Sequence, residues 1–183
     1  MYTLIMNGNP DRGGSAFESW LDDFVQGLEA KGHETARVDL RELDIKFCTG
    51  CWSCWWATPG KCVFRDDMVQ IYPEMVRADL IVWASPLVLG NVSALTKTAQ
   101  DRFIPLAHPY IEIVDGECHH RKRYEHNAKV GLVVAPTAQD GPEDLRIVRQ
   151  FYERFSKNTR SSFTLFATID TPVEEAINEA LAG

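Results

Sequence analysis

The feature that most restricts the fold of this chain is a regular alternation of short apolar runs with segments of helical periodicity. The runs lie at residues 3–6, 80–84, 130–135 and 163–169, and residues 34–40 alternate between polar and apolar residues as a further strand. Between them, apolar residues recur at the spacing of an amphipathic helix, most clearly over residues 17–28. Strands that alternate with helices in this way predict a parallel sheet with helices on both faces.

We expect an α/β, three-layer, doubly wound sheet of five parallel strands in the flavodoxin-like order 2-1-3-4-5. Right-handed crossovers leave few topologies, and five strands favour this order over the six-stranded alternative. No repeat or linker divides the 183 residues, so residues 1–183 are predicted to form one domain. Two segments interrupt the alternation, a cysteine-rich loop at residues 47–65 and an excursion at residues 107–127.

Local signals mark the predicted helix ends. Ser15 and Glu18 have the spacing of a capping box, and Ser93 can cap the helix that follows the third strand. Asp66 or Asp67 is expected to cap the helix that follows the cysteine-rich loop.

Four of the five cysteines fall within fifteen residues, at the spacing C-x2-C-x2-C-x7-C. They are Cys48, Cys51, Cys54 and Cys62. Soft thiolate ligands select iron-sulfur clusters, zinc or copper(I). Structural zinc usually takes two separated Cys-x-x-Cys pairs, whereas overlapping triplets are typical of 4Fe-4S ligation. The spacing favours a cluster, with reduced thiols or a redox dithiol as the first alternative and zinc as the second.

Two loops are expected to meet where the strand order reverses, which is the usual ligand site of such sheets. Residues 9–15 combine glycines, the Arg12 cation and the Ser15 hydroxyl at a helix N-terminus, which suits a phosphate. Residues 86–91 are apolar and include Gly90, which suits the face of an aromatic ring system. The polar loop at 135–139 would form the third wall.

Three motifs together resemble one known family. Residues 8–16 resemble the G-S-P-R-x-x-G-N-T phosphate loop of the NADPH-dependent FMN reductases. Residues 85–102 resemble that family's S-P-V-Y-x-G-x-x-S-x-x-x-K-x-x-x-D-R flavin-ring segment, and the cysteine motif followed by residues 66–68 resembles its iron-sulfur flavoprotein branch. The likeness covers residues 4–104.

The resemblance implies FMN as cofactor, NAD(P)H as electron donor, a possible 4Fe-4S cluster and a homodimer or homotetramer. The candidate cofactor contacts are Asn9, Arg12, Gly14, Ser15, Ala16, Pro86, Leu87, Val88, Leu89, Gly90, Asn91 and Thr137. Val88 replaces an aromatic residue that the family often has beside the ring, and Trp52, Trp55 or Trp56 could restore that wall. No side chain is singled out as catalytic, because hydride transfer to a flavin requires no general acid or base.

Charge and composition restrict the partners. Lys plus Arg is 19 and Asp plus Glu is 26, a formal net charge of −7, which disfavours nucleic acid as a partner. The N-terminus lacks the pattern of a signal peptide and no run is long enough for a membrane span, so a cytoplasmic protein without a membrane partner is expected. The run at residues 118–123, which includes Cys118 and two histidines, is interpreted as a solvated arm or a subunit contact.

The sequence therefore predicts an FMN-dependent NAD(P)H oxidoreductase that passes electrons to a small-molecule acceptor or a redox partner protein. Three alternatives stay open. One is a two-electron quinone or azo-type reductase without a cluster. The others are a non-catalytic electron carrier of the flavodoxin kind and a zinc-stabilised interaction module.

Overall fold

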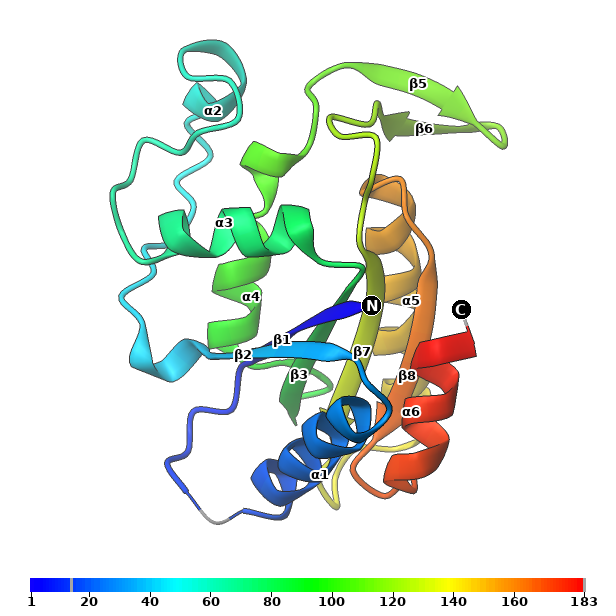
Figure 1. Cartoon of the computed structure of the whole chain (residues 1–183). Coiled ribbons are helices and arrows are strands. Elements are labelled where there is room, and N and C mark those ends of the chain that lie inside the picture. Colours follow the sequence, from blue (N-terminus) through cyan, green and yellow to red (C-terminus); the bar gives the residue numbers. More distant parts are fainter. Residues whose placement is uncertain (14, 183) are drawn as a thin grey trace.

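A five-stranded parallel sheet forms the centre of the computed structural model, which describes residues 1–13 and 15–182 (Figure 1). Its strands are β1 (Tyr2–Asn7), β2 (Glu34–Asp39), β3 (Leu80–Val88), β7 (Lys129–Ala135) and β8 (Phe163–Thr168). They are arranged in the order β2-β1-β3-β7-β8 and every neighbouring pair is parallel. The predicted 2-1-3-4-5 order is confirmed.

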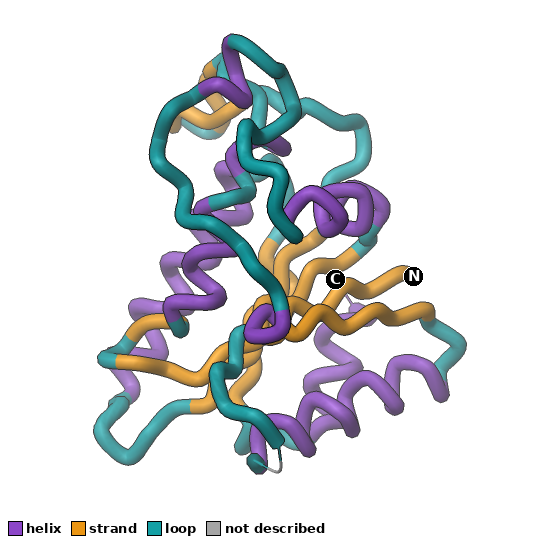
Figure 2. The backbone as a smooth tube through the Cα atoms, turned by 90° about the vertical axis from the view of Figure 1, so that its left-hand side faces the viewer, coloured by secondary structure: helices purple, strands orange, loops and turns teal. Residues whose placement is uncertain are grey.

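Helices cover both faces of the sheet (Figures 1 and 2). One face carries α1 (Ala16–Ala30) and α6 (Val173–Ala182), whose apolar sides pack together against the strands. The other face carries α3 (Met68–Arg77), α4 (Ala94–Asp101) and α5 (Pro142–Asn158). The arrangement is the expected three-layer sandwich.

The central strand β3 shows why its sequence is apolar throughout. Leu80, Val82 and Ala84 belong to the core under α1 and α6. Ile81 and Trp83 belong to the core under α3 and α5, and Trp83 is fully buried. Alternate side chains of a strand point to opposite faces, so a strand with helices on both sides needs apolar residues at every position.

The remaining elements lie outside the main layers. They are η1 (Leu40–Glu42), α2 (Ser53–Trp56), β4 (Asn91–Val92), η2 (Ile104–Leu106), β5 (Ile111–Val114) and β6 (Glu117–His120). β5 and β6 pair as a separate antiparallel hairpin within the predicted excursion at residues 107–127. This hairpin stands at the same end of the molecule as α2, as Figure 1 shows.

A buried polar network fixes the start of α1. Ser15 accepts the Glu18 amide as predicted, but the Glu18 carboxylate is not the second half of a capping box. It accepts bonds from the side chains of Asn7 and Asn9 and pairs with two arginines, Arg37 and Arg41. Burial alone would raise the pKa of Glu18, but the bonds from Asn7 and Asn9 and the charge of Arg37 outweigh it and lower the pKa.

Glu18→Gln is therefore expected to destabilise the fold by about 2–3 kcal/mol, because the two arginines lose the negative charge that they share and one acceptor oxygen is replaced by an NH2 group that cannot accept their hydrogen bonds. Since the folded-state pKa is lowered, the Glu18 contribution is present above the unfolded value near 4.5 and is lost as the pH falls through the folded value. Urea unfolding at neutral pH and at successively lower pH measures both effects. Asp22→Asn, which removes an exposed partner of the same Arg37, should cost less than about 1 kcal/mol; equal losses would contradict the argument.

Candidate functional site

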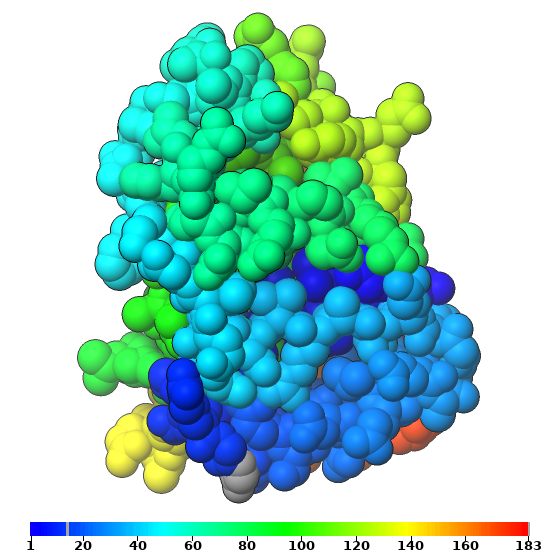
Figure 3. Space-filling view, turned by 60° about the vertical axis from the view of Figure 1, so that its left-hand side comes forward, coloured from blue at the N-terminus to red at the C-terminus, as the bar shows by residue number. Residues whose placement is uncertain are grey.

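The three loops predicted to hold a cofactor meet at the carboxyl edge of the sheet. Residues 8–13, the β3–β4 turn and residues 137–141 gather on one side of the surface, where Figure 3 shows blue, green and yellow side by side. Ser93 links the first two, because its hydroxyl donates to the Gly8 carbonyl at 2.6 Å and caps α4 through the Thr96 amide. The predicted juxtaposition is therefore present.

Gly8 sets the distance between the first loop and α4. A Cβ at this position would lie 1.8 Å from the Thr96 Oγ1 and 3.0 Å from the Ser93 Oγ. Thr96 is fully buried and cannot withdraw into solvent. The chain therefore needs glycine here for close packing of the loop on the helix.

Gly8→Ala should cost about 2–3 kcal/mol, because overpacking at a buried contact forces backbone and side chains apart. The change should also loosen the loop at residues 9–15. Denaturant unfolding measures the loss, and the added change Thr96→Ala should recover part of it by removing the hydroxyl that clashes. No loss in the single variant would show that the loop does not rest on α4 as described.

The predicted ring-binding segment is a tight β-hairpin. β3 and β4 pair through Leu87–Val92 and Val88–Asn91, and the two residues between them, Leu89 and Gly90, have φ of 52° and 73°. Two consecutive positive φ angles are typical of a type I′ turn. Leu89 is fully exposed and Val88 is half exposed. A Cβ on Gly90 would lie 2.9 Å from Asp144 Oδ1, so protein packing as well as φ demands glycine there.

In the predicted phosphate loop, some side chains are bonded within the protein and others are exposed. Asn9 is buried and its side chain is bonded to Glu18 and to the Asp11 amide. Arg12 is exposed and pairs at 3.2 Å with Glu42, also exposed, an arrangement that costs little to break. Ser15 caps α1 and Ala16 is its exposed first residue. Gly14 lies outside the described residues.

The third wall is closed by its own hydrogen bonds. The amide and hydroxyl of Thr137 both donate to Asp140 Oδ2, at 2.7 and 2.8 Å. Asp140 also accepts the Gly90 amide, and these bonds together lower the pKa of Asp140. The turn at residues 137–140 is thereby tied to the β3–β4 hairpin.

The four clustered cysteines surround one cavity. A space of about 250 Å³ is lined by the side chains of Cys48, Cys51, Cys54 and Cys62 together with Trp52, Val63, Phe64, Arg102, Ile104 and Pro105. The backbone curls around it with positive φ at Gly50, Trp52 and Gly60. Trp52 at φ 59° is a strained position for a bulky residue, and such strain concentrates at functional sites.

The thiols of this cavity differ in their environments. Burial, with the neighbouring Cys62, Cys48 and Cys51, raises the pKa of the Cys54 thiol. The amide and hydroxyl of Ser53 lower the pKa of the exposed Cys51 thiol. In the described part of the chain, no three His, Cys, Asp or Glu side chains are placed to hold a metal ion. The four cysteines share the lining of one cavity.

Two aspartates close the cysteine segment at its base. Asp66 or Asp67 was expected to cap α3; Asp67 occupies the N-cap position but makes no side-chain cap bond. Asp67 accepts the Asp44 amide at 2.7 Å and Asp66 accepts the Lys46 amide at 2.9 Å, so residues 44–46 and 66–67 are held side by side.

The buried side chain of Arg102 also holds residues 44–46 and 66–67 together. It is 1% exposed and donates to Asp66 at 2.6 and 3.0 Å and to the Lys46 carbonyl at 2.7 Å. Burial alone would lower the pKa of Arg102, but the Asp66 carboxylate raises it. The Arg102 Nε lies buried without a hydrogen-bond partner among the described residues, and Arg102 also lines the cysteine cavity.

The tryptophans of the segment lie away from the loops that are predicted to hold a cofactor in this chain. Trp55 donates from Nε1 to the carbonyls of Ile104 and Ala107, each at 3.2 Å. Its ring contacts Trp52 at 4.6 Å and His120 at 5.3 Å between centroids. Figure 1 shows this part of the chain, around α2, at the opposite end of the molecule from the β1–α1 loop.

Helix α4 joins the two regions. Its cap Ser93 lies beside the predicted cofactor loops, and its last residue Asp101 and the following Arg102 line the cysteine cavity. Its 8 residues correspond to about 12 Å. Cys118 is exposed on β6, and the neighbouring His119 is buried and bonded to Asn158 and Glu117, so neither belongs to the cavity.

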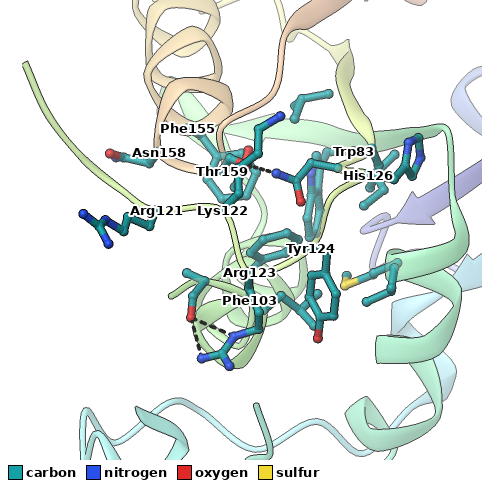
Figure 4. A pocket seen from close by; sticks show the side chains of 18 residues that line it. Trp83, Phe103, Arg121, Lys122, Arg123, Tyr124, His126, Phe155, Asn158 and Thr159 are labelled. Atoms are coloured by element: carbon teal, nitrogen blue, oxygen red, sulfur yellow. Dashed lines mark hydrogen bonds between the residues drawn. The ribbon is translucent and has the colours of Figure 1, made fainter. Parts of the chain in front are cut away.

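A smaller cavity lies under residues 121–128 and is not a cofactor site. It measures about 30 Å³, enough for one water molecule. Figure 4 shows Trp83 and Phe155 on its inner side and Tyr124 at its edge, with Arg123 bonded to the Ala107 carbonyl. The Nε1 of the fully buried Trp83 has no hydrogen-bond partner among the described residues. A water molecule in this cavity would supply the acceptor.

Comparison with known proteins gives one family match. The model of the family described as NADPH-dependent FMN reductase matches residues 1–155. An iron-sulfur flavoprotein of Archaeoglobus fulgidus is 37% identical over 101 residues, covering 55% of this chain and 44% of that protein. The chain thus spans about half the length of the relatives it matches.

Solved structures share the fold at low sequence identity. An NAD(P)H:quinone oxidoreductase from Methanothermobacter marburgensis superposes with a TM-score of 0.65 at 17% identity, over 98% of this chain and 92% of that one. An FMN-dependent NADH-azoreductase from Bacillus anthracis, solved with FMN, gives 0.65 at 14% identity, over 100% and 95%. No helix in the described part of this chain is long and apolar enough to cross a membrane.

Proposed function

Because the chain belongs to the NADPH-dependent FMN reductase family, we propose that it is an FMN-dependent NAD(P)H oxidoreductase whose cysteine cavity holds a 4Fe-4S cluster. The observation that carries the proposal is the single short helix α4, which begins at the predicted flavin loops and ends at the cavity that four thiols line. One rigid element would thus fix the relative position of both cofactors.

The flavin would lie at the carboxyl edge of the sheet. The first amides of α1, with Ser15 and the exposed Arg12, suit the phosphate, since a helix N-terminus binds anions with its free N–H groups. The apolar tip of the β3–β4 hairpin, residues 86–91, and the turn at Thr137 would contact the ring system. Bound FMN would supply hydride and electron transfer, and the loops would position it.

Four thiols around a cavity support a cluster over a single ion. Zinc–sulfur bonds of about 2.3 Å draw four tetrahedral ligands to about 3.8 Å from one another, whereas a cluster separates them because each cysteine binds a different iron. The volume of about 250 Å³, lined by all four cysteines, fits the cluster. The buried Arg102 Nε offers an unused donor at the wall.

We also propose a homo-oligomer, in which the exposed apolar side chains find a partner. Leu89 at the hairpin tip is fully exposed, Phe47 is 74% exposed and Trp56 is 71% exposed. Side chains of this size rarely stay in water without a contact surface. Phe47 directly precedes Cys48 and Trp56 lies between Cys54 and Cys62, so a partner subunit would cover the cysteine segment in part.

Anaerobic reduction by nicotinamide tests the proposed activity. Purified protein mixed with one equivalent of NADPH or NADH should lose its flavin absorbance, and a quinone added afterwards should restore it. Reduction by dithionite but by neither nicotinamide would show a carrier that depends on another reductase. Bleaching and recovery in a sample without iron would support the two-electron reductase without a cluster.

A further inference from the structure

A large groove lies on the far side of Cys62 from the cysteine cavity. It measures about 690 Å³, and its walls are the 58–62 turn and the face of α3 that carries Val69, Tyr72 and Val76. Cys62 lines both this groove and the cysteine cavity. On the surface, the cysteine segment and α3 are neighbours, in cyan and green in Figure 3.

The groove has the character of a small-molecule site. Its volume lies within the range of about 300–1,000 Å³ of known ligand pockets, which are mostly apolar with a few placed polar groups. Tyr72 is held by the bond from its hydroxyl to the Arg102 carbonyl at 2.9 Å. Tyr124 closes one side and directly follows Arg123, which bonds to the Ala107 carbonyl (Figure 4). Two fixed aromatic side chains suit a flat ligand.

The charge of the groove is opposite to that of the chain. Lys61, Arg65 and Arg77 line it, and no carboxylate does among the described residues, although the net charge of the chain is −7. Arg77 is balanced by Glu34 and Glu74, so Lys61 and Arg65 carry the excess. An isolated positive surface on an acidic protein directs anions to that place.

We propose that this groove binds a planar aromatic anion of the quinone type as the electron acceptor. The inference rests on the proposed function, and it places the acceptor next to Cys62 and away from the flavin loops. Reduction of the quinone consumes the two electrons and one proton of reduced nicotinamide and one proton from solvent. The products are the hydroquinone and oxidised nicotinamide.

Equilibrium dialysis of the oxidised holoprotein with naphthoquinone sulfonate, and with uncharged naphthoquinone, tests the site. Lys61→Gln with Arg65→Gln should weaken binding of the sulfonate on the order of tenfold, because two exposed ion pairs are lost, and leave the uncharged quinone unchanged. Val69→Trp fills the groove from an exposed position and should weaken both compounds without a change of charge. Arg146→Gln with Arg149→Gln on α5 removes the same charge elsewhere and should leave both unchanged.

Wild-type affinity in both groove variants would overturn the proposal and place the quinone at the flavin loops. Equal loss in the α5 control would overturn it as well, because net charge alone would explain binding. No binding of either compound to the wild type would overturn the proposal outright. Flavin and iron measured on the same samples separate these results from failure of the proposed function, which would appear as wild-type protein without either cofactor.

Discussion

Replacing Asp66 by alanine is expected to destabilise the fold by about 3–5 kcal/mol and to release the base of the cysteine segment. The side chains of Asp66 and Arg102 are 4% and 1% exposed, and removal of one partner leaves the other charge buried without compensation. The Lys46 amide loses its acceptor at the same time. Urea unfolding of the cofactor-free protein measures the loss, and hydrogen exchange over residues 44–67 should show the segment opening first.

Asp101→Ala is the matched control, because it removes the same charge from an exposed pair with Lys97 one residue before Arg102. Its expected cost is below about 1 kcal/mol. The pKa of Asp66 is lowered by the Arg102 bond despite the opposing effect of burial, so this stabilisation is present at neutral pH and is lost as the pH falls through the folded-state pKa. A loss no larger than in the control would mean that the pair does not hold the segment closed.

Cys54→Ser should remove bound iron from the anaerobically purified protein while FMN stays bound. Cys54 is the buried thiol of the four, and a serine hydroxyl is a far poorer ligand for iron than a thiolate. The flavin loops lie at the other end of α4, so their packing should not change. Iron, acid-labile sulfide and FMN per chain, assayed on one sample, report the outcome.

Cys118→Ser is the control for this experiment. Cys118 is exposed on β6, outside the cavity, and its loss should leave iron and sulfide at the wild-type level. Retention of full iron content in the Cys54 variant would remove that residue from the ligand set. Loss of iron from the Cys118 variant would show that the iron site includes the β5–β6 hairpin.

The fold was predictable because burial imposes a pattern on the sequence. The continuous apolar run of β3 follows from helices on both of its faces, and Ser93 at the start of α4 carries the signal of its cap. The cysteine spacing likewise pointed to one site, and the four thiols do share a cavity. Local signals of this kind can be recognised in the sequence without knowledge of distant contacts.

Long-range polar contacts could not be predicted in the same way. Glu18 has the spacing of a capping residue, yet its carboxylate forms ion pairs with Arg37 and Arg41 from the β2 region. Asp66 has the position of a helix cap, yet its partner Arg102 is 36 residues away. Residues 85–91 were expected as a loop, yet residues 85 and 86 pair with β7 and residues 87 and 88 pair with β4. In each case a tertiary partner outweighed the local preference.

The most direct test of the account is the cofactor content of protein purified without oxygen. The visible spectrum, together with iron, acid-labile sulfide, zinc and FMN assayed per chain, should show flavin bands over a broad iron-sulfur absorbance, with about four irons and four sulfides for each FMN. One zinc and no sulfide per chain would contradict the cluster and indicate a structural zinc site in the cavity. A colourless protein that takes up no added FMN would contradict the flavoprotein assignment as a whole.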